Sequence, residues 1–356
     1  MRRSDSLRWI GSVAAGSLLA GLTCTAQTPG PPSRAAFGIT AVPGVRVGHA
    51  ARSERPTGCT VILLPDGTVG GVDVRGGAPG TAETDVLAPD NMVQIVNAIV
   101  LSGGSAYGLD VRGGGMKYLE EHKTGFGVGG GVVPIVPAAI LFDLGVGGRF
   151  DIRPDATCGY QAASIAATGT IAEGSVGAGT GATVGKLGGS GRAMKGGIGT
   201  ASLTGANGLV VGAIVAVNAV GTVFDRHTGK AVAGLRTTDG QSLQDPWALV
   251  ARGPLPGPPP LENTTIGVIA TNARLTKAQA LRISEMAHDG IARAIVPSHT
   301  QSDGDTLFAV GTGSLALDID VTLIGQLAAE AVSDAILRAV RLAKGLPGYP
   351  AVSDLK

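Results

Sequence analysis

The chain has 356 residues, of which 44% are hydrophobic and 15% are charged, and this balance excludes an intrinsically disordered protein. A formal net charge of +1 with few aromatic residues argues against nucleic-acid binding. The length allows one large domain or two. Glycine accounts for 58 residues without a collagen repeat, so we expect many tight turns and close backbone packing.

The N-terminus has the pattern of a secretory signal peptide. A basic start at residues 2–8 precedes an apolar stretch at residues 9–22, and small residues lead to Ala26. The stretch is too short for a stable membrane span. We therefore expect residues 1–26 to be removed, residues 27–36 to form a tether, and the mature protein to be periplasmic or secreted.

The cysteines leave several alternatives open. Cys24 allows lipid attachment, although the residues before it match that signal poorly, and a twin-arginine signal or a buried first helix are other interpretations of this segment. Cys59 and Cys158 remain after cleavage, and an oxidising compartment would let them pair. We favour the simpler interpretation of two small buried apolar residues.

The rest of the chain alternates strand-like and helix-like segments. Val93, Val96 and Val100 recur at helical spacing, Thr276 can cap a helix, and Gly345 can end one. Mixed strands and helices, with several strands apolar throughout, indicate sheets covered by helices. In chain order we expect strands at 60–64 and 69–74, helices at 90–107, 116–122 and 159–168, strands at 209–217, 220–225 and 265–271, a helix at 277–294, a strand at 306–310 and a helix at 323–344.

Two glycine motifs resemble nucleotide-binding sequences but lack the required context. Gly125–Gly130 matches G-x-G-x-x-G yet follows an expected helix rather than a strand, so no dinucleotide site is predicted. Gly185 and Lys186 resemble the end of a P-loop, but Thr180 and Leu187 replace essential residues of that motif. Nor do the histidines show metal-ligand spacing; they are His49, His122, His227, His288 and His299.

A proline-rich run at 254–260 leads through Asn263 directly into an apolar strand that begins with Thr264 and Thr265. A threonine at a chain N-terminus carries both a nucleophilic hydroxyl and its own amine as base. An internal threonine gains that amine only after the preceding bond is cut, and its hydroxyl can make the cut by attacking the carbonyl of Asn263. An ordinary loop–strand junction is the alternative.

Several separated segments occur in the order found in a known family: VAVNAVGTVFD, NTTIGVIATNARL and HTQSDGDTLFAV, with GITAVPGVRVGHA, GGSAYGL and PAAILFDL before them. Together they resemble the L-aminopeptidase/D-esterase family of self-cleaving N-terminal-nucleophile hydrolases. The threonine-bearing branch, which contains 6-aminohexanoate-oligomer hydrolases, is the most similar. The resemblance extends from about Ile39 to the last expected helix.

The resemblance implies cleavage between Asn263 and Thr264, with Thr264 as the catalytic nucleophile. Asn218 falls where the family has an oxyanion-stabilising asparagine, although a turn between two strands also explains it. Lys186 matches a lysine near the nucleophile, where a cation would keep the Thr264 amine neutral. The alternative for Lys186 is a solvated loop lysine.

Two acids and two further residues complete the implied site. Asp303 and Asp305 match the D-G-D acids of the threonine branch, but Asp-Gly-Asp is also a plain turn sequence. Ser302 falls where the serine-bearing branch has a second active-site serine, and we rank it below the acids. Phe142 replaces a frequent tyrosine, which removes a hydroxyl and puts direct transfer of nylon-oligomer activity in doubt.

The implied fold is α/β, a four-layer αββα sandwich of two packed β-sheets flanked by helices. Residues 37–263 and 264–356 would form the α-fragment and β-fragment of one interwoven catalytic domain. The substrate would be a small peptide, an amino-acid amide or a 6-aminohexanoate oligomer, with no metal or organic cofactor. A homo-oligomer, a tetramer of processed units, is also implied. The alternatives are an ornithine acetyltransferase-like acyltransferase and a non-enzymatic envelope protein.

Overall fold

A computed structural model describes residues 33–34, 38–251, 253, 263–316 and 320–355. The predicted signal peptide, most of the tether and the proline-rich run lie outside these ranges. Among the described residues, no helix has both the length and the apolar composition needed to cross a membrane.

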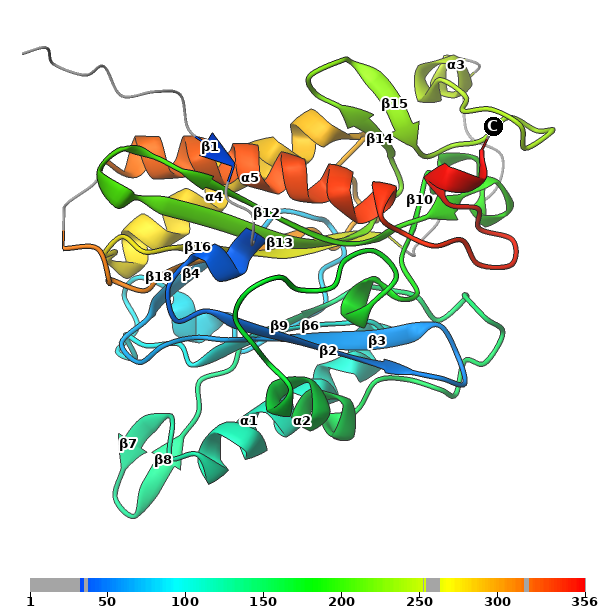
Figure 1. The fold of residues 1–356 in the computed structure, drawn as a ribbon. Coiled ribbons are helices and arrows are strands. Elements are labelled where there is room, and N and C mark those ends of the chain that lie inside the picture. Colours follow the sequence, from blue (N-terminus) through cyan, green and yellow to red (C-terminus); the bar gives the residue numbers. More distant parts are fainter. Residues whose placement is uncertain (1–32, 35–37, 252, 254–262, 317–319, 356) are drawn as a thin grey trace, which may run out of the picture. The chain divides into compact units, whose positions relative to one another are not determined.

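The first sheet has six strands (Figure 1). All its pairings are antiparallel except that between its fourth and fifth strands, which run parallel. In spatial order the strands are β1 (Ser33–Arg34), β12 (Gly197–Thr204), β13 (Val210–Asn218), β16 (Thr264–Thr271), β18 (Thr306–Gly311) and β4 (Val69–Val74).

The second sheet has five strands and packs face to face against the first (Figure 1). Only its β6–β9 pairing is parallel. In spatial order the strands are β2 (Arg46–Arg52), β3 (Thr57–Leu63), β6 (Ala98–Ser102), β9 (Ala138–Ile140) and β5 (Thr81–Ala82).

Strand β13 shows why the central strands are apolar at every position. Side chains alternate between the two faces of a strand, and Ile214 and Ala216 point into the core between the two sheets. Val215 and Val217 point the other way, into a core beneath the covering helices. A strand buried on both faces is a continuous hydrophobic run.

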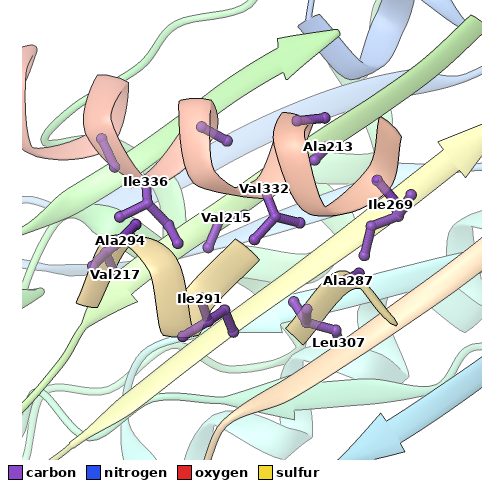
Figure 2. Close-up of a cluster of buried hydrophobic side chains, with 14 of the residues drawn as sticks. Ala213, Val215, Val217, Ile269, Ala287, Ile291, Ala294, Leu307, Val332 and Ile336 are labelled. Atoms are coloured by element: carbon purple, nitrogen blue, oxygen red, sulfur yellow. The ribbon is translucent and has the colours of Figure 1, made fainter. Parts of the chain in front are cut away.

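Two long helices cover the outer face of the first sheet: α4 (Lys277–Ala294) and α5 (Val321–Arg341). Thr276 caps the start of α4, as the sequence predicts, and forms a reciprocal capping box with Gln279. Figure 2 shows Ala294 of α4 and Ile336 of α5 near Val217 of the sheet, all within one buried cluster. Burial of these apolar stripes fixes both helices on the sheet.

The outer face of the second sheet is covered by α1 (Val111–Glu121) and α2 (Ala156–Ser164), as Figure 1 shows. Helices therefore flank two packed sheets, so the predicted four-layer αββα arrangement is confirmed. The smaller elements are the hairpin β7 (Phe126–Val128) and β8 (Gly131–Val133), the pair β10 (Thr183–Val184) and β11 (Met194–Lys195), the sheet β15 (Lys230–Ala233), β14 (Thr222–Asp225) and β17 (Ile295–Val296), and α3 (Pro246–Val250).

The helix expected at 90–107 is wrong. Residues 90–97 form a turn and loop, and Ala98–Ser102 is a fully buried strand of the second sheet. A short continuous apolar run fits a buried strand as well as a helix, so the valine spacing was misleading. The last helix also ends earlier than expected, at Arg341 rather than 344.

Candidate active site

Thr264 lies at the point where three strand ends of the first sheet meet. It is the first residue of β16 and stands opposite Asn218, the last residue of β13. On its other side, Asn263 bridges to Asp303 in the loop before β18. Thr264 is only 4% exposed. The topology of the sheet thus brings together residues that are far apart in the sequence.

The carbonyl oxygen of the peptide bond before Thr264 accepts two hydrogen bonds. The Thr264 hydroxyl donates a hydrogen bond to the carbonyl oxygen of Asn263, so the predicted nucleophile lies at the bond it is expected to cut. The backbone N–H of Gly304 donates to the same oxygen over 3.0 Å. A donor fixed at a carbonyl oxygen also stabilises the negative charge that nucleophilic attack would create there.

The side-chain amide of Asn218 is fixed by donors on one side and an acceptor on the other. Its Oδ1 accepts from the backbone N–H of Thr183 at 2.9 Å and from Nζ of Lys186 at 3.0 Å. Its Nδ2 donates to the carbonyl oxygen of Phe142 at 2.9 Å. These partners determine which end of the amide is the donor. Phe142 thus contributes its backbone carbonyl to the site.

Lys186 is buried, with 1% of its surface exposed, so it is not a solvated loop residue. It follows Gly185, whose left-handed φ of 79° turns the chain inward. Nζ donates to both the carbonyl oxygen and Oδ1 of Asn218. A buried ammonium group requires such acceptors, and its charge acts on the neighbouring acids.

Asp303 and Asp305 lie in the loop at 299–305, which closes over Asn263 and Thr264. Asp305 accepts a 2.6 Å hydrogen bond from the backbone N–H of Thr265 through Oδ1. Burial and, to a lesser extent, the charge of Asp305 raise the pKa of Asp303 to about 6, although hydrogen bonds from Thr300 and the charge of Lys186 oppose the shift. This acid can therefore exchange a proton near neutral pH.

Ser302 lies in the same loop and contacts the residue before the expected cut. Its Oγ accepts from Nδ2 of Asn263 at 3.3 Å and lies 3.2 Å from Oγ1 of Thr300. The structure therefore brings together all the residues that the sequence nominated, although they come from five separate segments of the chain. They are Phe142, Lys186, Asn218, Asn263, Thr264, Ser302, Asp303 and Asp305.

A buried ion pair beneath this cluster had no signal in the sequence. Asp143, directly after Phe142, pairs with Arg55 at 2.8 Å, and neither side chain is exposed. Thr57 donates to the second oxygen of Asp143 at 2.6 Å. The pair anchors the segment that supplies the Phe142 carbonyl to Asn218. Isolated arginines and aspartates give no sequence pattern, so only the fold identifies the pair.

Lys195 is a second buried cation that the sequence did not single out. Its Nζ donates to three backbone carbonyls, those of Gly179, Ala182 and Gly196, at 2.8–3.0 Å. Burial lowers its pKa to about 7. Lys195 also pairs with Thr183 across β10 and β11. It thereby supports the segment whose Thr183 N–H orients Asn218.

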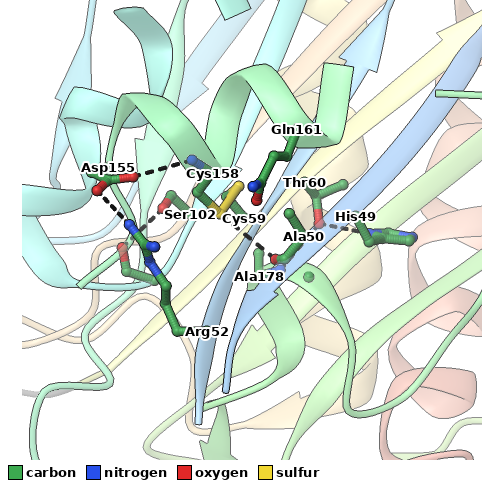
Figure 3. The surroundings of a disulfide bond; sticks show 12 residues. His49, Ala50, Arg52, Cys59, Thr60, Ser102, Asp155, Cys158, Gln161 and Ala178 are labelled. Carbon is green, nitrogen blue, oxygen red and sulfur yellow. Dashed lines mark hydrogen bonds and ion pairs between the residues drawn. A yellow bond between two sulfur atoms is a disulfide. The ribbon is translucent and has the colours of Figure 1, made fainter. Parts of the chain in front are cut away.

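Cys59 and Cys158 form a disulfide that links β3 to α2 (Figure 3). Our favoured interpretation of Cys59 and Cys158 as unpaired apolar residues is therefore wrong. Asp155 caps α2 by accepting from the N–H of Cys158 and also pairs with Arg52. The disulfide holds this short helix against the sheet. It joins two cysteines that are 99 positions apart in the sequence.

Residues 38–352 match the family model described as peptidase family S58. The chain belongs to this family. An aminopeptidase of Mycobacterium leprae, described as uncharacterised, is 44% identical over 341 residues, which are 88% of this chain and 92% of the relative. A 6-aminohexanoate-oligomer endohydrolase of a Kocuria species is 31% identical over 344 residues, covering 88% and 92% respectively.

Two solved structures show the same fold. A β-aminopeptidase from a Burkholderia species superposes with a TM-score of 0.64 at 25% identity, covering 88% of this chain and 89% of that one. The L-aminopeptidase D-Ala-esterase/amidase of Ochrobactrum anthropi gives a TM-score of 0.65 at 20% identity, covering the same shares, and shows the same N-terminal-nucleophile hydrolase fold. The family resemblance inferred from the sequence is confirmed, and this S58 protein is an amide-bond hydrolase.

Proposed function

We propose that this S58 protein is made as a precursor that cuts itself between Asn263 and Thr264. The exposed Thr264 then hydrolyses amide bonds in small peptides, amino-acid amides or 6-aminohexanoate oligomers. The substrate classes follow from what the relatives are named to act on. Residues 264–356 supply the nucleophile and two acids, and residues 37–263 supply Asn218 and Lys186.

The observation that carries this proposal is the geometry at the Asn263 carbonyl. The Thr264 hydroxyl and the Gly304 N–H both donate to its oxygen. Attack by the hydroxyl oxygen on the carbonyl carbon forms a C–O bond and breaks the C–N bond. The product is an ester between Asn263 and Thr264 with a newly formed Thr264 amine. Water then hydrolyses the ester, which restores the hydroxyl and leaves a carboxylate on Asn263.

The cut does not separate the two fragments. Strands β16 and β18 follow the cut, yet they lie in the first sheet between β13 and β4, which precede it. Hydrogen bonds on both sides would hold the fragments as one interwoven domain. Thr264 would become a chain terminus without leaving its place opposite Asn218.

After the cut, the Thr264 amine is the base for its own hydroxyl. A chain-terminal amine has a pKa of about 7.7–8.0, so part of it is neutral near pH 7. The ammonium of Lys186 favours the neutral amine by charge repulsion. Asn218 donates from its amide nitrogen to the substrate oxygen that becomes negative. Water then hydrolyses the acyl-threonine ester, which releases the acid product.

The decisive experiment compares intact masses of the purified protein and its Thr264→Ala variant. We expect two chains from the wild type, with the second beginning at Thr264, and one uncut chain from the variant. Thr264→Ser keeps a hydroxyl and should retain cutting. A folded wild-type protein that remains a single chain and still hydrolyses amides would contradict the proposal.

An acyltransferase that uses the same threonine predicts transfer to an added amine instead of hydrolysis. The names of the relatives support hydrolysis. Incubating the processed protein with an amide substrate and excess free amine separates the two reactions. Hydrolysis releases the free acid, whereas the acyltransferase alternative would yield mainly the new amide.

We also propose that the protein acts outside the cytoplasm. The signal pattern at residues 1–26 and the Cys59–Cys158 disulfide support this location, because structural disulfides form in oxidising compartments. Fractionation of the native host, with the N-terminus of the mature chain sequenced, tests it. A cytoplasmic protein that retains residues 1–26 would contradict it.

A further inference from the structure

The two acids beside Thr264 are held by different kinds of donor. Asp305 accepts through Oδ2 from both the backbone N–H and Nδ1 of His299, at 3.1 and 2.8 Å. Its Oδ1 accepts from the N–H of Thr265. Asp303 accepts through Oδ2 from the N–H and hydroxyl of Thr300, at 2.8 and 2.6 Å. Among these partners, only the donors to Asp305 include a titratable ring.

The His299 ring can bind Asp305 in this way because of its backbone. Its φ of 55° is left-handed, a conformation that non-glycine residues other than asparagine, aspartate and histidine seldom adopt. This turn directs the N–H and the ring of one residue at one carboxylate oxygen. An ionised carboxylate only accepts, so Nδ1 of His299 carries the proton in this pair. Hydrogen bonds from both groups stabilise the charged form of the acid.

The far side of the His299 ring faces a second histidine. The rings of His299 and His288 meet edge to face with centroids 4.8 Å apart, and His288 is fully buried. Burial lowers the pKa of His288 to about 4, so this neighbour is neutral near pH 7. Its Nε2 lies 3.1 Å from the carbonyl oxygen of Asp73. The His288 ring therefore packs against His299 without adding charge.

We propose that His299 is a positioning residue that holds the Asp305 carboxylate in place beside Asp303, so that Asp303 is the acid that takes up and releases the proton at this site. Two carboxylates in one buried site cannot both remain charged at little cost, and the better-solvated one keeps its charge. Here His299 takes the place of solvent for Asp305. The test of this proposal by enzyme activity rests on the proposed function, whereas its test by protein stability does not.

Other charged groups face this pair and enter the design of the test. The charge of Lys186 lowers the pKa of Asp303, and the Thr264 amine joins the site after the cut. On the other side of the His299 ring, α4 contributes His288. The end of β4 contributes Asp73, which pairs with Arg75 at 2.7 Å. All of these residues are retained in variants at position 299. The pKa of His288, which the charge of His299 helps to lower, is about 4 and lies below the range measured, so a shift near pH 6 reports the effect of the ring on the acids.

Two substitutions separate the ring from the backbone. His299→Gly tolerates the left-handed turn and keeps the backbone N–H, but loses the side-chain donor. His299→Asn also tolerates the turn and retains a side-chain N–H. His122→Gly, at an exposed histidine that ends α1, is the matched control. Each protein is processed, and kcat/KM for an amino-acid amide is measured from about pH 5 to about pH 9.

In the wild type we expect activity to fall below about pH 6, as Asp303 is protonated. Without the ring donor the negative charge of the carboxylate pair is stabilised less, so the coupled pair takes up its first proton at higher pH. In His299→Gly the acidic limb should therefore move up by about one pH unit. His299→Asn should stay closer to the wild type, and His122→Gly should match it. An unmoved limb in His299→Gly, or an equal shift in His299→Asn, overturns the proposal.

A second measurement tests the proposal even if the His299→Gly protein does not cut itself. In the Thr264→Ala background neither protein is cut, and melting temperature is followed over the same pH range. The transition centred near pH 6 in Thr264→Ala should move to higher pH in Thr264→Ala/His299→Gly. Coincident curves overturn the proposal. Failure of the proposed function instead appears as an uncut wild type, whatever the melting curves show.

Discussion

Asn218 and Thr264 form the last antiparallel pair between β13 and β16, so the amide and the hydroxyl lie side by side at one end of the sheet. The pair joins the two parts of the chain on either side of the expected cut. Partners on both ends of the Asn218 amide hold its orientation before any substrate arrives. A preorganised donor of this kind is effective because it need not reorient during the reaction.

Replacement of Asn218 by alanine should lower kcat of the processed enzyme by about 10²–10³-fold, with a smaller change in KM. The reason is the loss of a donor needed mainly in the transition state. If the variant cuts itself too slowly to yield processed enzyme, its rate of self-cleavage is compared with that of the wild type instead. Asn207→Gly, at an exposed left-handed turn, is the control and should leave both rates unchanged. A normal kcat in Asn218→Ala would exclude an oxyanion role.

Gly304→Ala should slow or block self-cleavage. A β-carbon at this position would lie 2.8 Å from the carbonyl oxygen of Ala78 and 3.0 Å from Oγ1 of Thr264, so the loop would have to shift. The shift would move the N–H that binds the Asn263 carbonyl. The fraction of cut chain is followed over time by denaturing electrophoresis. Gly191→Ala, where a β-carbon meets no atom within 4 Å, should process normally.

Asp303 should make the uncut protein less stable as pH rises. Its pKa is raised in the folded state from 3.8 to about 6, so the folded protein binds this proton more tightly than the unfolded chain. The resulting stabilisation is complete below about pH 3.8 and is lost as pH passes through about 6. In the Thr264→Ala background, Asp303→Asn should remove this part of the pH dependence of the melting temperature.

The control for that experiment is Asp66→Asn, at an exposed turn residue. It should reproduce the pH dependence of the Thr264→Ala protein. If Asp303→Asn also reproduces it, the proton near pH 6 belongs to another group. Melting temperatures at matched ionic strength suffice for the comparison, because the curves are compared within one background.

The disulfide should contribute substantially to stability. Cys59 and Cys158 are 99 positions apart, and closing so long a loop in the unfolded chain is worth about 4–5 kcal/mol by chain entropy. The double variant Cys59→Ala/Cys158→Ala should therefore unfold at lower denaturant concentration. Reductant should lower the wild-type midpoint and leave that of the double variant unchanged. Equal wild-type midpoints with and without reductant, after full equilibration, would show that the disulfide contributes little.

The local sequence pattern predicted several helices and strands correctly. The range expected for α4 is its observed range, because an apolar stripe at helical spacing coincides with a capping box at Thr276. The strand expected at 306–310 is β18, which is one residue longer. The segment 90–107 failed because its short apolar run satisfies helix and strand patterns alike. Pairing with β3 and β9 made Ala98–Ser102 a strand.

The sequence by itself nominated the reactive group and correctly predicted the fold class. Thr264 was nominated by covalent chemistry, which depends on neighbours in the chain, and the family motifs supplied the remaining candidates. Only the tertiary structure decided which groups act on them: Gly304 on the Asn263 carbonyl, Thr183 and Lys186 on Asn218, and His299 on Asp305. Hydrogen-bond geometry and burial depend on residues distant in the sequence, and these interactions exist only once the sheets and loops have packed.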